Sequence, residues 1–240
     1  MKLLDTGNGN FKLKKTASSF ESIRVAGLSL MPDEIICPWC VKAGCKELCL
    51  QESGKGVMSN VAEGRQRKTD FWHADKQAFL NQLERELFNF EKLCARNNVT
   101  PWVRLNVLSD IPYEKHGIPQ SFPNLNMYDY TKNAVRLTSK KLPSNYGLMF
   151  SYSGKPEYQS QVERALKTDV PISVVFTEIP TDPSYRFLGR RVINGDRSDI
   201  LNLKSGKVII GLKYKRTRAT ALDVFNSDFV VDPNNLAIAA

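Results

Sequence analysis

Four of the five cysteines lie within thirteen residues, and this segment constrains the fold more than any other part of the sequence. Cys37, Cys40, Cys45 and Cys49 follow the spacing C-x2-C-x4-C-x3-C. Four thiolates complete a tetrahedral shell around Zn²⁺ or hold a [4Fe-4S] cluster. Two disulfides and thiols without any ligand are the alternative interpretations. The pattern therefore predicts a metal-binding loop over residues 35–56, which we call the cysteine loop.

The charge of the chain indicates what kind of partner it has. Its 240 residues carry 34 Lys and Arg against 25 Asp and Glu, a net charge of +9. This excess favours polyanions, so we expect nucleic acid or a phosphorylated ligand as partner. A basic surface that serves only solubility is the alternative. No apolar run approaches the roughly 20 residues that span a bilayer, and the first residues lack a signal-peptide core. We therefore expect no membrane partner and a cytoplasmic location, where thiols stay reduced.

One long amphipathic helix is expected from about residue 70 to residue 96. Its apolar stripe consists of residues three or four apart: Phe79, Leu83, Leu87, Phe90 and Cys94. On this stripe Cys94 is expected to be a buried core residue rather than a fifth ligand. The alternation of Phe11-Lys-Leu-Lys-Lys predicts a strand near the N-terminus.

Short apolar runs that end in polar groups fill much of the remaining chain. They begin at Ile23, Trp102, Asn124, Tyr146, Ile172 and Lys207. Helical or loop segments separate several of them, as in sheets whose strands run parallel. We therefore expect an α/β fold in one domain over residues 1–240, with a parallel or mixed, partial-barrel sheet and the cysteine loop near its N-terminus.

The polar groups at the strand ends are candidate catalytic residues: Asp110, Asp129, Lys132, Glu178 and Asp196. Carboxylates gathered at one edge of a sheet can bind Mg²⁺ or act as acid and base, and a lysine can neutralise phosphate. The alternative is that strands simply end in polar turn residues. Ser109, Ser151 and Ser153 belong to the same pattern.

A basic run near the C-terminus is the candidate nucleic-acid contact. It consists of Lys213, Lys215, Arg216 and Arg218, with Tyr214 between the first two. Alternating basic and aromatic residues can grip a phosphate backbone and stack one base. A solvated charged face explains the run almost as well.

An ordered series of motifs resembles the gene-product-88-like family of phage and mobile-element proteins. It includes Cys45-Lys-Glu-Leu-Cys49, Asn60-Val-Ala-Glu-Gly-Arg65, Val103-Arg-Leu-Asn-Val-Leu-Ser-Asp110, Met127-Tyr-Asp-Tyr-Thr-Lys132 and Val174-Val-Phe, and spans most of residues 5–215. The resemblance implies a phage or plasmid origin, hence the interior of a host cell, and carries no established activity.

The cysteine loop after an early strand also resembles radical S-adenosylmethionine enzymes. Cys45-x3-Cys49 fits the first half of their C-x3-C-x2-C signature, but Glu52 stands where the third cysteine belongs. The leading hypothesis is thus a phage-type metalloprotein that binds or processes nucleic acid. The alternatives are an iron–sulfur enzyme that modifies a nucleotide or macromolecule, and a non-enzymatic protein that binds a host factor.

Overall fold

The computed structural model describes residues 1–6, 11–18, 20, 22–46, 48–217 and 219–234. Contacts divide the chain into two compact units built from interleaved segments. The first unit comprises Met1–Cys37, Lys55–Asp129 and Lys140–Gly147. The second comprises Pro38–Gly54, Tyr130–Ser139 and Leu148–Ala240. The single-domain prediction remains a prediction.

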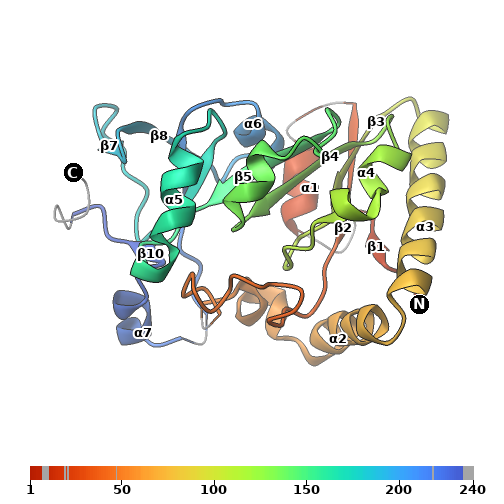
Figure 1. The fold of residues 1–240 in the computed structure, drawn as a ribbon, viewed down its shortest axis with the longest axis horizontal. Coiled ribbons are helices and arrows are strands. Elements are labelled where there is room, and N and C mark those ends of the chain that lie inside the picture. The colour runs from red at the N-terminus through yellow and green to blue at the C-terminus, as the bar shows by residue number, and fades with distance from the viewer. Residues whose placement is uncertain (7–10, 19, 21, 47, 218, 235–240) are drawn as a thin grey trace. The chain divides into compact units, whose positions relative to one another are not determined.

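Helices and strands are interspersed along the described chain (Figure 1). The α-helices are α1 (Phe11–Ala17), α2 (Ser59–Ala74), α3 (Lys76–Arg96), α4 (Ile118–Ser121), α5 (Gln159–Leu166), α6 (Asp199–Leu203) and α7 (Ala221–Asn226). The strands are β1 (Leu4–Asp5), β2 (Ile23–Leu28), β3 (Thr100–Arg104), β4 (Asn126–Thr131), β5 (Tyr146–Ser151), β6 (Ile172–Phe176), β7 (Arg186–Phe187), β8 (Arg190–Asn194), β9 (Ile209–Lys213) and β10 (Val230–Val231).

The sheet of the first unit has the strand order β1-β2-β3-β4. β1 runs antiparallel to β2, whereas β2, β3 and β4 are parallel, with Val25 opposite Trp102 and Val103 opposite Met127. Helix α1 packs on β2 at Gly27. A Cβ at this position would lie 2.7 Å from Leu13 Cδ1, so the close contact requires a glycine. The strand predicted at Phe11 is wrong: a helix forms, and buries Leu13 and Thr16 three residues apart on one face.

The apolar stripe predicted for the long helix lies on α3, and all five of its residues are buried. Cys94 is 0% exposed, which confirms it as a core residue. The predicted start near residue 70 is wrong. Asp75 has a non-helical backbone conformation and separates α2 from α3. The Asp75 side chain accepts a hydrogen bond from the Ala78 N–H at 2.9 Å, as an N-cap residue does.

The sheet of the second unit has the order β5-β6-β9-β8-β7, and β10 also pairs with β6. All these pairs are parallel except β7 with β8. β9 pairs with β6 along its whole length, from Ile172 to Phe176. On the other edge β5 pairs with Ile172 and Ser173, and β10 pairs with Val175 and Phe176. β5 and β10 therefore share one edge of β6 in succession.

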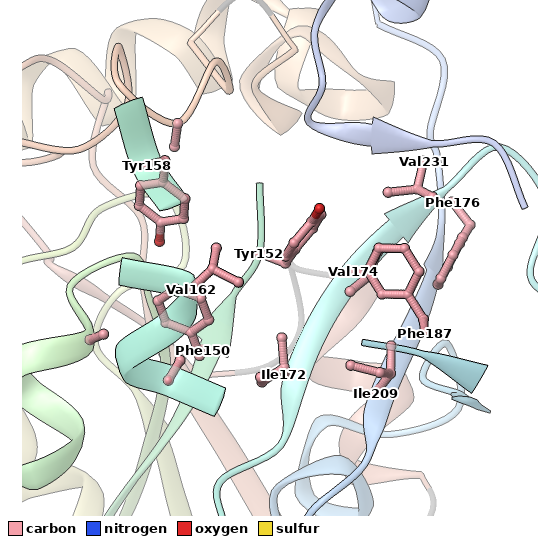
Figure 2. Packing of buried hydrophobic residues seen from close by; sticks show 13 residues of the cluster. Phe150, Tyr152, Tyr158, Val162, Ile172, Val174, Phe176, Phe187, Ile209 and Val231 are labelled. Atoms are coloured by element: carbon pink, nitrogen blue, oxygen red, sulfur yellow. The ribbon is translucent and has the colours of Figure 1, made fainter. Parts of the chain in front are cut away.

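The core of the second unit lies between α5 and this sheet. Figure 2 shows Phe150 and Val162 on one side of the cluster and Phe176 and Phe187 on the other. The Phe150 ring stacks on the Tyr158 ring with centroids 5.8 Å apart. Ala43 from the cysteine loop and Ala134 complete the same cluster, so three separate chain segments build this core.

The predicted α/β class with a mixed sheet is confirmed. Among the described residues no strand pairing closes either set of strands into a barrel, so the barrel-like part of the prediction has no support. No helix in the described part of the chain has the length and apolar character needed to cross a bilayer.

Candidate functional site

Three of the predicted site residues meet where β6, β8 and β9 end in the second unit. Lys213 Nζ lies 2.7 Å from Glu178 Oε1, and the Lys213 N–H donates to Asp196 Oδ2 at 3.3 Å. The Lys213 and Glu178 side chains are 54% and 70% exposed. An ion pair this exposed contributes at most about 1 kcal/mol. The strand-end pattern thus brings these residues together, as a solvent-exposed pair.

The basic segment that follows β9 is held by Tyr214. Its N–H donates to the Phe176 carbonyl at 2.8 Å, and its hydroxyl lies 2.9 Å from Thr217 Oγ1. On either side of this anchor Lys213, Lys215 and Arg216 are exposed. Arg218, the fourth predicted contact, lies outside the described residues.

Lys132 and Ser151 come together after β4 and at the end of β5. Lys132 Nζ donates to Ser151 Oγ at 3.0 Å. The Tyr158 hydroxyl lies 2.6 Å from the Lys132 carbonyl oxygen and 3.0 Å from that of Ser151. One hydroxyl thereby fixes the backbone of both residues, and Tyr158 itself is buried. The strand-end prediction selected Lys132, whereas Tyr158 carried no sequence signal.

Two aromatic rings lie near the Lys132 ammonium. Its Nζ lies 4.5 Å from the centre of the Phe229 ring and 5.7 Å from that of Tyr158. A cation near an aromatic face is attracted by the ring quadrupole. Trp39 from the cysteine loop contacts the same tyrosine edge-on, with centroids 6.1 Å apart.

In the first unit, Asp129 is the centre of a buried polar network and is 0% exposed. Its Oδ1 accepts the Asn106 N–H at 2.7 Å, and its Oδ2 accepts Asn106 Nδ2 at 3.0 Å and the Tyr146 hydroxyl at 2.5 Å. Asn106 Oδ1 in turn accepts the Ser109 hydroxyl and the Ile111 N–H. The carboxylate therefore fixes the chain that follows β3.

Two further groups lie in the same segment after β3. Asp110 is 9% exposed, and its N–H donates to the Ile36 carbonyl at 2.8 Å, next to Cys37. The Tyr113 hydroxyl is buried, and no hydrogen-bond partner lies within its reach in the described part of the chain. Burial, and then the negative charge of Asp129, raise the pKa of Tyr113 well above its usual value. The phenol stays neutral.

Most of the cysteine loop, Pro38–Gly54, belongs to the second unit. Gly44 has a positive φ of 60°, and a Cβ there would lie 2.9 Å from the Ser227 carbonyl oxygen and 2.8 Å from Lys155 Cε. Lys155 Nζ lies 3.6 Å from Asp228 Oδ2. The loop therefore packs closely on the segments around Lys155 and Ser227, and this contact requires a glycine at position 44.

No disulfide joins any of the five cysteines, all of which are described. The Cys37 thiol lies 3.4 Å from the Leu108 carbonyl oxygen, and the Cys45 thiol lies 3.6 Å from that of Cys40. Within the described ranges no group of three or more His, Cys, Asp or Glu side chains is arranged to hold a metal ion. Thiolates are suitable ligands for zinc and for iron–sulfur clusters. The positions of the four thiols in this structure are not those of a metal site.

Several residues of these clusters were not selected from the sequence. Asn106 lies within a run expected to be strand, but the strand ends at Arg104 and leaves Asn106 to bond with Asp129. Tyr130 donates to Asp199 Oδ1 at 2.8 Å, and Asp199 is 1% exposed.

Comparison with known proteins gives one match. A family model described as Gene product 88 matches residues 2–224. No curated protein matches the chain, and no solved structure matches it either. The resemblance to the gene-product-88-like proteins is therefore confirmed over most of the chain, whereas the resemblance to radical S-adenosylmethionine enzymes has no support.

Proposed function

We propose that this chain, which belongs to the gene product 88 family, is a metalloprotein that binds nucleic acid through the carboxyl edge of the sheet in its second unit. The observation that carries the proposal is the exposed basic segment after β9. Tyr214 anchors it, and Lys213, Lys215 and Arg216 extend from it into solvent. The net charge of +9 supports an anionic partner.

The basic residues of this segment are not equivalent. Lys213 is paired with Glu178, so part of its charge is already offset. Lys215 and Arg216 follow in an exposed stretch without regular secondary structure. We therefore assign the main phosphate contacts to Lys215 and Arg216, with Arg218 as the fourth member of the predicted run.

The candidate acidic residues support binding more than catalysis. Both carboxylate oxygens of Asp129 accept hydrogen bonds from neighbouring groups, which suits a role in holding Asn106 and Tyr146. Glu178 and Asp196 both contact Lys213. We assign these carboxylates to the architecture of the strand ends, and Mg²⁺ chemistry there remains a hypothesis.

In this proposal Cys37, Cys40, Cys45 and Cys49 hold Zn²⁺ or a [4Fe-4S] cluster whose role is to fix the cysteine loop. The thiols would converge by a rearrangement of the loop. Metal analysis and the visible spectrum of protein purified without oxygen test this assignment. We expect about one zinc ion or one cluster per chain, with a brown colour only for the cluster. Protein without metal, with all four cysteines alkylated readily, would contradict it.

Salt dependence tests the nucleic-acid interface. The affinity for a single-stranded oligonucleotide should fall as salt rises, since each phosphate contact releases counterions. The double variant Lys215→Met/Arg216→Met should lower both the affinity and the slope of log K against log salt, by roughly 0.7 per contact removed.

The matched control removes two charges from the opposite end of the same strands. Lys167 follows α5 before β6 begins, and Lys207 precedes β9. Lys167→Met/Lys207→Met has the same change in net charge and should leave the slope unchanged. Equal slopes for the two double variants would show that only net charge matters and would reject the basic segment as the interface.

A further inference from the structure

A tyrosine, a lysine and an aspartate meet in the second unit, after β5 and before β10. The Gly154 N–H donates to the Asp228 carbonyl at 2.7 Å and so joins these two segments. The position that a Gly154 Cβ would take lies 3.3 Å from the Tyr152 hydroxyl oxygen and 3.5 Å from Asp228 Cβ. Lys155 Nζ lies 3.6 Å from Asp228 Oδ2. We call the side chains of Tyr152, Lys155 and Asp228 the Asp228 cluster.

The Tyr152 hydroxyl is a buried group directed into this cluster. Tyr152 is 4% exposed, and Figure 2 shows its hydroxyl turned away from Phe150 and Ile172. In the part of the chain that the structure describes, this hydroxyl makes no hydrogen bond. Burial, and then the negative charge of Asp228, raise the pKa of Tyr152 to about 12, so the phenol keeps its proton. Because a buried hydroxyl without a partner costs free energy, a ligand that accepts its proton would be favoured.

The Asp228 carboxylate can accept hydrogen bonds from a ligand. Its side chain is 50% exposed, and the 3.6 Å to Lys155 Nζ exceeds the length of a hydrogen bond. Asp228 has a φ of 51°, in the left-handed region that few residues other than glycine adopt. The stem of Lys155 packs on the cysteine loop, since a Cβ at Gly44 would lie 2.8 Å from Lys155 Cε. Backbone and packing therefore hold the two charged groups side by side.

The mixture of donors and acceptors limits the class of ligand. A carboxylate alone would favour a cation and an ammonium alone an anion, but here each opposes the ligand of the other. A neutral group that presents N–H donors beside an acceptor fits both. The Watson–Crick edge of guanine presents N1–H and N2–H next to O6, and this edge is accessible in a single strand. The other bases each present one donor group on this edge, so guanine alone can occupy both carboxylate oxygens.

We propose that the Asp228 cluster binds a guanine base, with the Asp228 carboxylate accepting from N1–H and N2–H while Lys155 and Tyr152 donate to O6. This inference deepens the proposed function, on which the choice of a nucleobase rests. The cluster lies at the carboxyl end of β5 and the basic segment at that of β9, and both strands pair with β6 in parallel. Open parallel sheets bind ligands at this edge.

Fluorescence anisotropy of two labelled single-stranded oligothymidylates, one with a central guanine and one with a central adenine, tests the proposal on the full chain. The parent protein should prefer guanine by about tenfold or more, as for a bidentate base contact. Asp228→Asn should reduce this preference to about twofold or less, because an amide has one acceptor oxygen and its N–H₂ group opposes those of guanine. Asparagine also tolerates the left-handed backbone. Tyr152→Phe should lower the affinity for guanine about threefold and leave that for adenine unchanged.

Asp169→Asn is the matched control. Asp169 Oδ1 also lies 3.6 Å from a lysine, Lys207 Nζ, but at the opposite end of the strands. This variant should keep the preference of the parent for guanine. Equal affinities of the parent for the two oligonucleotides, or the same preference in Asp228→Asn as in Asp169→Asn, would overturn the proposal. If Asp228→Asn fails to fold, Tyr152→Phe decides, since it keeps the buried ring.

Salt dependence and free nucleotides separate this inference from the proposed function. Oligonucleotide binding that depends on salt, Lys215 and Arg216 but shows no preference for guanine would reject the inference and keep the proposed function. Guanosine 5′-monophosphate that binds more tightly than adenosine 5′-monophosphate, with the difference lost in Asp228→Asn, would support the guanine site. If that result came without salt-dependent oligonucleotide binding, the guanine site would stand and the proposed interface would be rejected.

Discussion

Two tyrosine hydroxyls in the first unit differ in whether they have a partner. Tyr146 donates to Asp129 Oδ2 at 2.5 Å, whereas the Tyr113 hydroxyl has no partner among the described residues. Both side chains are almost fully buried. A buried hydroxyl stabilises a fold only when it is hydrogen-bonded, and otherwise it costs the free energy of removing it from water.

The same substitution should therefore have opposite effects at these two tyrosines. Tyr146→Phe should lower the free energy of unfolding by about 1–3 kcal/mol, since a hydrogen bond to a charged group is lost. Tyr113→Phe should be neutral or stabilise the protein by about 1 kcal/mol. Urea denaturation measures both. Equal losses would show that Tyr113 has a partner that the structure does not reveal.

Asp33, which lies just before the cysteine loop in the sequence, should make the free energy of unfolding depend on pH. Burial acts to raise the pKa of Asp33, but hydrogen bonds from His73 and from the N–H groups of Ile36 and Ile35 outweigh it and lower the pKa below 3.8. His73 Nε2 lies 2.6 Å from Asp33 Oδ2. A carboxyl group whose pKa is lowered by folding stabilises the folded state at pH values above its ordinary pKa. This contribution is lost as the pH falls through the lowered pKa.

Asp33→Asn isolates the charge, because asparagine keeps an oxygen acceptor for the two backbone N–H groups. We expect a loss below about 1 kcal/mol at neutral pH, since the pair is more than a third exposed. The difference from the parent protein should disappear in acid, at a pH well below the lowered pKa of Asp33. Denaturation curves at both pH values measure it. A loss that persists in acid would point to the turn geometry rather than the charge.

At the scale of elements, the cysteine loop depends on one backbone conformation. Gly44 has a left-handed φ of 60°, and it lies against the Ser227 carbonyl. Gly206 has a similar φ of 71°, but nothing lies within 4 Å of the position its Cβ would take. The two glycines thus share the backbone requirement and differ only in close packing.

Gly44→Ala should destabilise the protein more than Gly206→Ala does. Both variants force an L-residue into the left-handed region, at about 1–2 kcal/mol. Only Gly44→Ala adds overlap with backbone, which typically costs a further 1–3 kcal/mol or so. Differential scanning calorimetry measures the difference. Equal effects would indicate that the loop moves away from Ser227 without loss.

The strands and the helix stripe could be predicted because periodicity depends on local residues. The apolar stripe of α3 is an example, as are the runs at Ile172 and Tyr146. The placement of β10 beside β6 could not be predicted, since it depends on contacts between distant residues. The break at Asp75 depends on a local N-cap, which the spacing of the apolar stripe does not reveal. The strand-end pattern likewise selected Lys132 and Asp129, but not the tyrosines that bind them, Tyr158 and Tyr146.

At the scale of the whole molecule, the chain passes repeatedly between the two units. The boundaries fall after Cys37, Gly54, Asp129, Ser139 and Gly147. The core of the second unit contains Ala43 and Ala134, which come from two of the inserted segments. Neither unit is therefore a continuous stretch of sequence, and two of the crossings interrupt the strands β4 and β5.

Because the segments interleave, we expect the full chain to unfold in one cooperative transition, in agreement with the predicted single domain. Tyr146→Phe in the first unit and Gly44→Ala in the second should each shift that transition as a whole. Calorimetry of both variants tests this. Two transitions, of which each variant shifts a different one, would show that the units are independent domains.

The contact between Trp39 and Tyr158 also provides an optical probe. The chain has three tryptophans: Trp72 and Trp102 belong to the first unit, and Trp39 belongs to the cysteine loop in the second. In a Trp72→Phe/Trp102→Phe background, emission would come from Trp39, half-buried within 6.1 Å of the Tyr158 ring centre. Its spectrum would then report on metal uptake by the cysteine loop, because Trp39 lies between Cys37 and Cys40.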